Sequence, residues 1–92
     1  MLAARRYLIR GRVQGVGFRY FAEMAAHREG LSGFVRNLPD GAVESAVEGD
    51  DASVERFERA LHRGPAGARV ESVAVEVLEP TCRFTGFSIR GS

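Results

Sequence analysis

A glycine-containing loop between a predicted strand and a predicted helix constrains this chain more than any other segment. Residues 5–12 alternate polar and apolar side chains as a half-buried strand does, and residues 20–28 have the spacing of an amphipathic helix. The loop between them contains Gly15 and Gly17 and ends at Arg19. Glycine can adopt positive φ and bring bare backbone close to a ligand. The chain must therefore turn from strand to helix at a point where backbone N–H groups can converge.

The composition of this loop suits an anion. Successive N–H groups in a tight turn can form a concave anion site, and a helix N-terminus adds unpaired donors and the positive end of its dipole. The guanidinium of Arg19 matches two phosphate oxygens at once. On the residues alone, two interpretations stay open: a phosphate or carboxylate cradle, and a structural turn with a surface arginine. Arg10, Arg12 and Arg36 either extend the positive field near this loop or form a solvated sheet face.

Two longer motifs resemble the signatures of the acylphosphatase family. The first is Gly-Arg-Val-Gln-Gly-Val-Gly-Phe-Arg at residues 11–19, and the second is Gly-Phe-Val-Arg-Asn-Leu-Pro-Asp-Gly-Ala-Val-Glu at residues 33–44. The resemblance extends from residue 5 to residue 90, and it implies an enzyme that hydrolyses acyl phosphates to a carboxylate and inorganic phosphate. The chain departs from the family at Phe34, where a tryptophan is frequent, and beyond Arg90, where many relatives have an aromatic residue nearby.

The resemblance also implies which residues act. It assigns the positioning of the attacking water to Asn37. The alternation of the strand supports this role, because Asn37 faces inward if Val35 does, and an inward-facing amide needs a partner. The alternative is an asparagine that only satisfies the following turn. Phosphate binding is assigned to the Arg19 side chain and to the backbone amides of the loop: Gly15, Val16, Gly17, Phe18 and Arg19.

The residue types that are missing near the loop exclude several mechanisms of phosphoryl transfer. Phosphatases of the cysteine type begin such a loop with a nucleophilic cysteine, but Val13 and Gln14 occupy that region. The chain contains no lysine, which a Walker-type loop requires. We therefore expect direct attack by water on the phosphoryl group, without a metal, cofactor or covalent intermediate. An acyl phosphate suits such a site, because its carboxylate leaving group has a conjugate acid with a pKa of about 4 to 5 and needs no general acid.

The remaining elements predict a ferredoxin-like α+β sandwich of order βαββαβ plus a short carboxyl-terminal strand. Further strands are expected at 32–38, 42–48, 70–79 and 84–90, and a second helix is expected between Asp50 and Gly64. Connections through helices place both helices on one face of a mainly antiparallel sheet, which the resemblance also implies. The expected core positions include Tyr20, Phe21, Met24 and Ala25 of the first helix and Val73, Val75 and Val77 of the fourth strand.

Size, charge and cysteine content limit the possible partners. With 92 residues, 45% of them apolar, and a formal net charge of +1, the chain is predicted to form one domain, 1–92, and not a general nucleic-acid binder. Cys82 is the only cysteine, which excludes an internal disulfide and a cysteine-built metal site. No apolar run is long enough to span a membrane. We expect a cytoplasmic monomer whose substrate is a small acyl phosphate, with inorganic phosphate or a similar anion as product or inhibitor.

Two other functions stay open at this point. A non-catalytic ferredoxin-like module can bind RNA or a small anion on the same fold, although RNA recognition favours stacked aromatic residues on the central strands and a stronger basic face. A carbamoyl-phosphate-handling domain of a larger enzyme would share both motifs. The lack of a linker or further module in the sequence favours a free-standing hydrolase over this second alternative.

Overall fold

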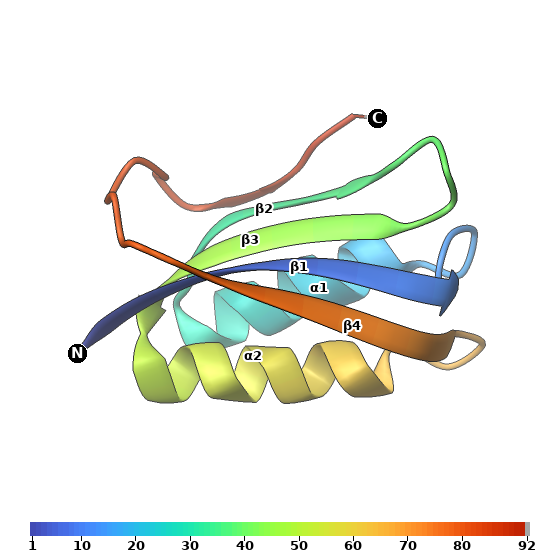
Figure 1. Cartoon of the computed structure of the whole chain (residues 1–92), viewed down its shortest axis with the longest axis horizontal. Helices are drawn as coiled ribbons and strands as arrows, with labels where there is room; N and C mark the ends of the chain where they lie inside the picture. The colour runs from blue at the N-terminus through green and yellow to red at the C-terminus, as the bar shows by residue number, and fades with distance from the viewer. Residues whose placement is uncertain (92) are drawn as a thin grey trace.

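The computed structural model describes residues 1–91, and Ser92, the last residue of the expected domain, lies outside them. Both helices lie on one side of a five-stranded sheet (Figure 1), which confirms the expected ferredoxin-like α+β sandwich. Every predicted end of an element lies within three residues of the observed one. The elements are β1 (Leu2–Arg12), α1 (Phe18–Glu29), β2 (Ser32–Asn37), β3 (Val43–Asp50), α2 (Asp51–Arg63), β4 (Arg69–Leu78) and β5 (Phe87–Ile89).

The central strand β3 determines how the other strands are placed. The order in the sheet is β4-β1-β3-β2-β5, and β3 pairs antiparallel with both β1 and β2. Since both neighbours run opposite to β3, they run in the same direction. Ile9 of β1 and Asn37 of β2 pair with the same residue, Val43. The carboxyl ends of β1 and β2 therefore lie at the same end of the sheet, and the loop after β1 begins near the end of β2.

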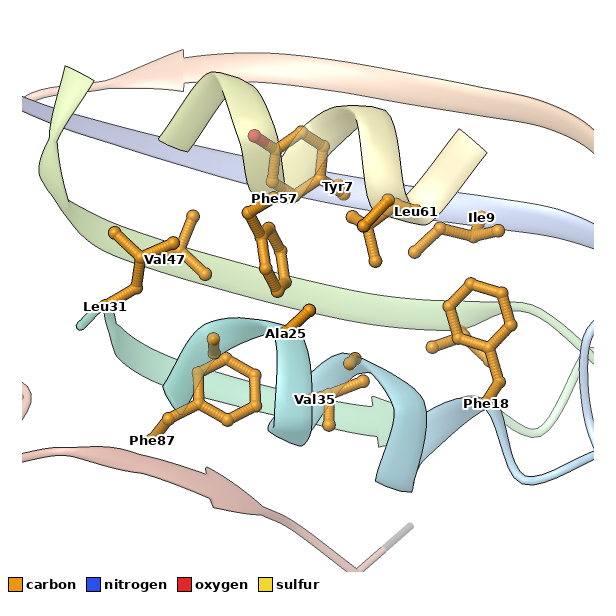
Figure 2. Packing of buried hydrophobic residues seen from close by; sticks show 14 of the residues in the cluster. Tyr7, Ile9, Phe18, Ala25, Leu31, Val35, Val47, Phe57, Leu61 and Phe87 are labelled. Atoms are coloured by element: carbon orange, nitrogen blue, oxygen red, sulfur yellow. The ribbon is translucent and has the colours of Figure 1, made fainter. Parts of the chain in front are cut away.

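Strand alternation decides which side chains face the helices. Tyr7 and Ile9 of β1 and Val35 of β2 are fully buried, and they meet Phe57 and Leu61 of α2 in the core between sheet and helices (Figure 2). Phe57 and Leu61 are four residues apart, so they lie on the same face of their helix. The side chains on this face of the sheet are thus held in a packed interior, and the position after Val35 on the same face is Asn37.

The first helix buries only part of the face that was predicted: Ala25 is buried and Phe21 packs against the core, as expected. It begins at Phe18, two residues before the expected start, and the ring of Phe18 is only 2% exposed. Tyr20 and Met24, predicted to belong to the core, are 68% and 70% exposed, so that prediction is wrong. With Phe18 anchored in the core, residues four and seven positions later face inward. The buried residues of α1 are Phe18, Ala22, Ala25 and Ala26.

The fourth strand also departs from its predicted packing, because it lies at the edge of the sheet. Val73 packs against the core, as expected. Val75 pairs with the buried Tyr7 and shares its face of the sheet, yet it is 43% exposed, and Val77 is 78% exposed. The prediction that these two valines join the core is therefore wrong. An edge strand has a neighbour on one side only, so side chains on its inward face can extend beyond the helix layer.

A buried carboxylate compensates arginine charges on the face of the sheet opposite the helices. Glu44 of β3 accepts hydrogen bonds from Nε of Arg6 at 2.6 Å and from Nε of Arg36 at 2.5 Å. Arg10 forms a separate ion pair with Asp40 at 3.1 Å. Arg10 and Arg36 therefore have carboxylate partners on this face, which favours the interpretation of a solvated sheet face over that of an extended positive field.

A second carboxylate on this face holds the segment between β4 and β5. The side chain of Glu48 accepts hydrogen bonds from the N–H of Thr81 at 2.6 Å, the N–H of Cys82 at 2.8 Å and the hydroxyl of Thr81 at 3.0 Å. The Thr81 amide contributes most to holding the pKa of Glu48 below its usual range, and the Cys82 amide adds to it, against the opposing effect of burial. The segment is therefore fixed by an ionised carboxylate.

We expect Glu48→Gln to reduce the free energy of unfolding at pH 7 by about 1–3 kcal/mol, because hydrogen bonds to a charged acceptor are lost. Since the folded-state pKa of Glu48 is lowered, its contribution is complete above the unfolded value of about 4.3 and is lost as the pH falls through the folded value. The difference between wild type and variant should therefore shrink on acidification below about pH 4 in urea unfolding experiments. The control is Glu79→Gln, which alters an exposed carboxylate. A Glu48→Gln difference that is unchanged at low pH would contradict the prediction.

Candidate functional site

Two glycines in the left-handed conformation turn the chain from β1 into α1. Gly15 has a φ of 76°, and Gly17, the N-cap of α1, has a φ of 79°. A Cβ added at either position would meet nothing within 4 Å. Glycine is therefore favoured here by backbone conformation and not by lack of space. The open space beside both glycines also leaves the backbone accessible from solvent.

The N-terminus of α1 offers hydrogen-bond donors to that space. The N-cap Gly17 forms no side-chain cap, and the first turn contains no acidic residue. The carbonyl of Gly17 accepts the N–H of Phe21 at 3.0 Å, whereas the N–H groups of the first turn have no intrahelical acceptor. These groups include those of Phe18, Arg19 and Tyr20. Free N–H groups at the positive end of a helix attract an anion.

The side chain of Gln14 ties this loop to the β2–β3 hairpin. Its Nε2 donates to the carbonyl oxygen of Leu38 at 2.8 Å and to that of Ala42 at 2.9 Å. These carbonyls lie on the two sides of the hairpin turn, directly after Asn37 and directly before Val43. The amide thus links the loop to the end of the strand that carries Asn37. No local pattern in the sequence predicts this role for Gln14, and its place inside the first motif is the only signal of it.

A hollow of about 120 Å³ lies where the loop, the start of α1 and the end of β2 meet. Val13 and Phe18 are buried and supply an apolar wall. Arg19 is the only charged residue that lines the hollow in the described part of the chain. The site therefore combines backbone donors, one guanidinium and one carboxamide. The lining residues are Val13, Gly15, Gly17, Phe18, Arg19, Tyr20 and Asn37.

Most of the predicted site residues meet in this hollow. Arg19 and Asn37, from different motifs, both line it, as do Gly15, Gly17 and Phe18. Asn37 lies on the helix side of the sheet, on the same face as Val35, as the alternation predicted. Val16 is the exception: its side chain is partly buried against the core, and the residue is not among those that line the hollow.

A second, larger hollow of about 430 Å³ lies beside β5 and shares no residue with the first. His27, Arg83 and Arg90 line it, and the guanidinium of Arg90 lies 4.0 Å from the centre of the Phe34 ring. The phenylalanine that stands where the family often has a tryptophan therefore stacks on an arginine. This hollow contains neither Arg19 nor Asn37, and the N-terminus of α1 contributes nothing to it.

Two further features of residues 1–91 concern metals and membranes. No three His, Cys, Asp or Glu side chains in this range cluster closely enough to share a metal ion. Neither helix of the described chain has the length and apolar character needed to cross a bilayer.

Comparison with known proteins gives a consistent result over nearly the whole chain. The family model described as Acylphosphatase matches residues 5–89. The acylphosphatase of Anaeromyxobacter dehalogenans is 48% identical over 85 residues, which cover 92% of this chain and 91% of that protein. The crystal structure of acylphosphatase from Bacillus subtilis superposes with a TM-score of 0.92 at 38% identity and covers 98% of this chain and 99% of its own. Full-length HypF in its phosphate- and nucleotide-bound form has a TM-score of 0.87 at 30% identity, over 99% of this chain but 12% of that one. Both motifs, the sheet order and these matches agree, and the chain belongs to the acylphosphatase family.

Proposed function

We propose that this protein hydrolyses small acyl phosphates to a carboxylate and inorganic phosphate by direct attack of water on phosphorus. One observation carries the proposal: Arg19 and Asn37 line a single hollow together with the loop glycines, and no other charged residue of the described chain lines it. Family membership supports the same reaction, because the relatives that match over most of their length carry the name acylphosphatase.

The hollow has the size and donors for one phosphoryl group. Its volume of about 120 Å³ is well above the roughly 10–15 Å³ that a single water molecule requires in a cavity, so it can hold a phosphoryl group. The N–H groups of Gly15, Val16, Gly17, Phe18 and Arg19 supply the cradle in this proposal, although Val16 is not among the residues that line the hollow. The Arg19 guanidinium binds two phosphoryl oxygens and stabilises the charge that builds on them in the transition state.

Asn37 orients the water in this mechanism. A carboxamide has both donor and acceptor atoms, so it can fix the position and the orientation of one water molecule. The water oxygen forms a bond to phosphorus while the bond from phosphorus to the acyl oxygen breaks, and the electron pair leaves with the carboxylate. The proton of the water passes to an oxygen of the phosphoryl group. Positioning and charge stabilisation thus carry the acceleration.

The side chains that line the hollow favour acyl phosphates over alkyl phosphates as substrates. Among the described residues, no carboxyl, imidazole or thiol group lines it, and its one hydroxyl, that of Tyr20, belongs to a largely exposed side chain. An alkoxide leaving group would need a proton from such a group, whereas a carboxylate leaves unassisted because its conjugate acid has a pKa of about 4 to 5. The mechanism therefore uses neither a general acid nor a phosphorylated residue, and it requires no metal or cofactor.

We further propose that the single domain 1–92 acts as a cytoplasmic monomer that does not bind nucleic acid. On the outer face of the central strands, Glu44 compensates Arg6 and Arg36. These ion pairs reduce the positive charge that the central strands offer to a phosphate backbone. The same hollow that binds the substrate is expected to bind inorganic phosphate, as product and as inhibitor.

A labelled-water experiment tests the reaction and its course. Acetyl phosphate should be hydrolysed in the presence of a chelator, and in oxygen-18 water the label should appear in inorganic phosphate. No phosphorylated protein should be trapped by rapid acid quenching during turnover. A trapped phosphoenzyme, or label in acetate, would contradict direct attack on phosphorus.

We expect Arg19→Gln to reduce kcat/KM for acetyl phosphate by at least about a hundredfold, because a donor to the transferring group and its charge are lost. Inhibition by inorganic phosphate should weaken strongly, while the circular dichroism spectrum stays unchanged. Arg28→Gln is the matched control, since it removes an exposed arginine from the last turn of the same helix. Equal losses in the two variants would assign the effect to general charge and not to the hollow.

We expect Asn37→Ala to lower kcat by about a hundredfold, as for the loss of one preorganised polar group. Competitive inhibition by inorganic phosphate should persist almost unchanged, because the cradle and Arg19 remain. Steady-state kinetics with phosphate as inhibitor measure both values in one series. Full activity in Asn37→Ala would exclude the water-orienting role.

A further inference from the structure

Two exposed apolar side chains lie on α1 beside the hollow. Tyr20 lines the hollow and is nevertheless 68% exposed. Met24 is 70% exposed and follows four residues later, so the two side chains are neighbours on the helix surface. Neither side chain belongs to the core cluster. Together they form an apolar strip, Tyr20–Met24, that begins at the hollow and runs along α1.

The acyl part of a substrate has to lie outside the hollow. In the proposed mechanism the phosphoryl group and the attacking water occupy this hollow of about 120 Å³, and the acyl group is attached to phosphorus through the bridging oxygen. The acyl group therefore extends over the rim. In the described lining, Val13 and Phe18 are buried, and the glycines have no side chain. Tyr20 is the one lining residue that offers an exposed apolar surface to this group.

The remaining lining residues cannot provide that contact. Arg19 and Asn37 are polar, and both are engaged with the phosphoryl group or the water in the proposed mechanism. The ring of Tyr20 presents a flat face that is suited to offset stacking on another ring. Met24 has a flexible thioether that adapts to irregular apolar groups and also contacts aromatic rings favourably.

We propose that the Tyr20–Met24 strip binds the acyl group, so that the preferred substrates are acyl phosphates with an aromatic or extended apolar acyl group and not acetyl phosphate. The inference rests on the proposed function and adds its substrate class. The contact exists both before and during bond breaking, so it lowers KM more than it raises kcat. Tyr20 is in this sense a specificity-determining residue.

The test compares benzoyl phosphate with acetyl phosphate in four proteins. They are the wild type, Tyr20→Ala, Tyr20→Phe and the control Val77→Ala, which truncates an apolar side chain of β4 that is 78% exposed and belongs to an element that contributes nothing to the hollow. The readout is the ratio of kcat/KM for benzoyl phosphate to that for acetyl phosphate. Because this ratio compares two substrates on the same protein, it is insensitive to the fraction of correctly folded enzyme.

We expect the wild type to favour benzoyl phosphate and the ratio to fall by about three- to tenfold in Tyr20→Ala, the range of one aromatic contact. The change should lie mainly in KM for benzoyl phosphate. Tyr20→Phe should retain the wild-type ratio, because the ring and not the hydroxyl makes the contact, and Val77→Ala should also retain it. An unchanged ratio in Tyr20→Ala, with both substrates hydrolysed by the wild type, would overturn the inference alone. A wild-type protein that hydrolyses neither substrate would overturn the proposed function itself.

Discussion

The pairing of β3 with both of its neighbours is the constraint on which the site depends. Ile9, Val43 and Asn37 form one row across the sheet, so the end of β1 and the end of β2 meet beside the hollow. A shift of β2 by one residue would move Asn37 to the opposite face. The two hydrogen bonds from Gln14 to the hairpin carbonyls act on the same junction. Sheet register and this amide together fix the distance between the two motifs.

The chemistry of the hollow comes mainly from the backbone, and packing holds that backbone in place. Val13 precedes the loop and Phe18 follows it, and both are almost completely buried. Between these two anchors, Gly15 and Gly17 adopt the left-handed conformation that turns the loop toward the helix N-terminus. Donors held in this way need little reorganisation when charge develops on the phosphoryl group, which is the condition for effective electrostatic stabilisation. The stability of the core thus supports the reaction directly.

Local patterns in the sequence predicted several parts of the site. Strand alternation placed Asn37 on the helix side, and the glycine spacing with Arg19 located the loop. The contacts of Gln14 could not be predicted from such patterns, because its partners Leu38 and Ala42 are distant in the sequence. The exposure of Tyr20 was not predicted either, because the helix begins at Phe18 and the buried stripe follows from that residue. Local sequence patterns likewise do not determine the order of the strands in the sheet, so the edge position of β4 is known only from the structure.

The most direct measurement of the central claim is an NMR titration of the backbone amides with inorganic phosphate. An anion site built from the loop and the start of α1 predicts saturable shifts concentrated at Gly15, Gly17, Phe18 and Arg19, with a further change in the side-chain amide of Asn37. Residues around the larger hollow, such as Arg83 and Phe87, should shift little. Saturable shifts centred on that second hollow, with the loop amides unaffected, would contradict the account.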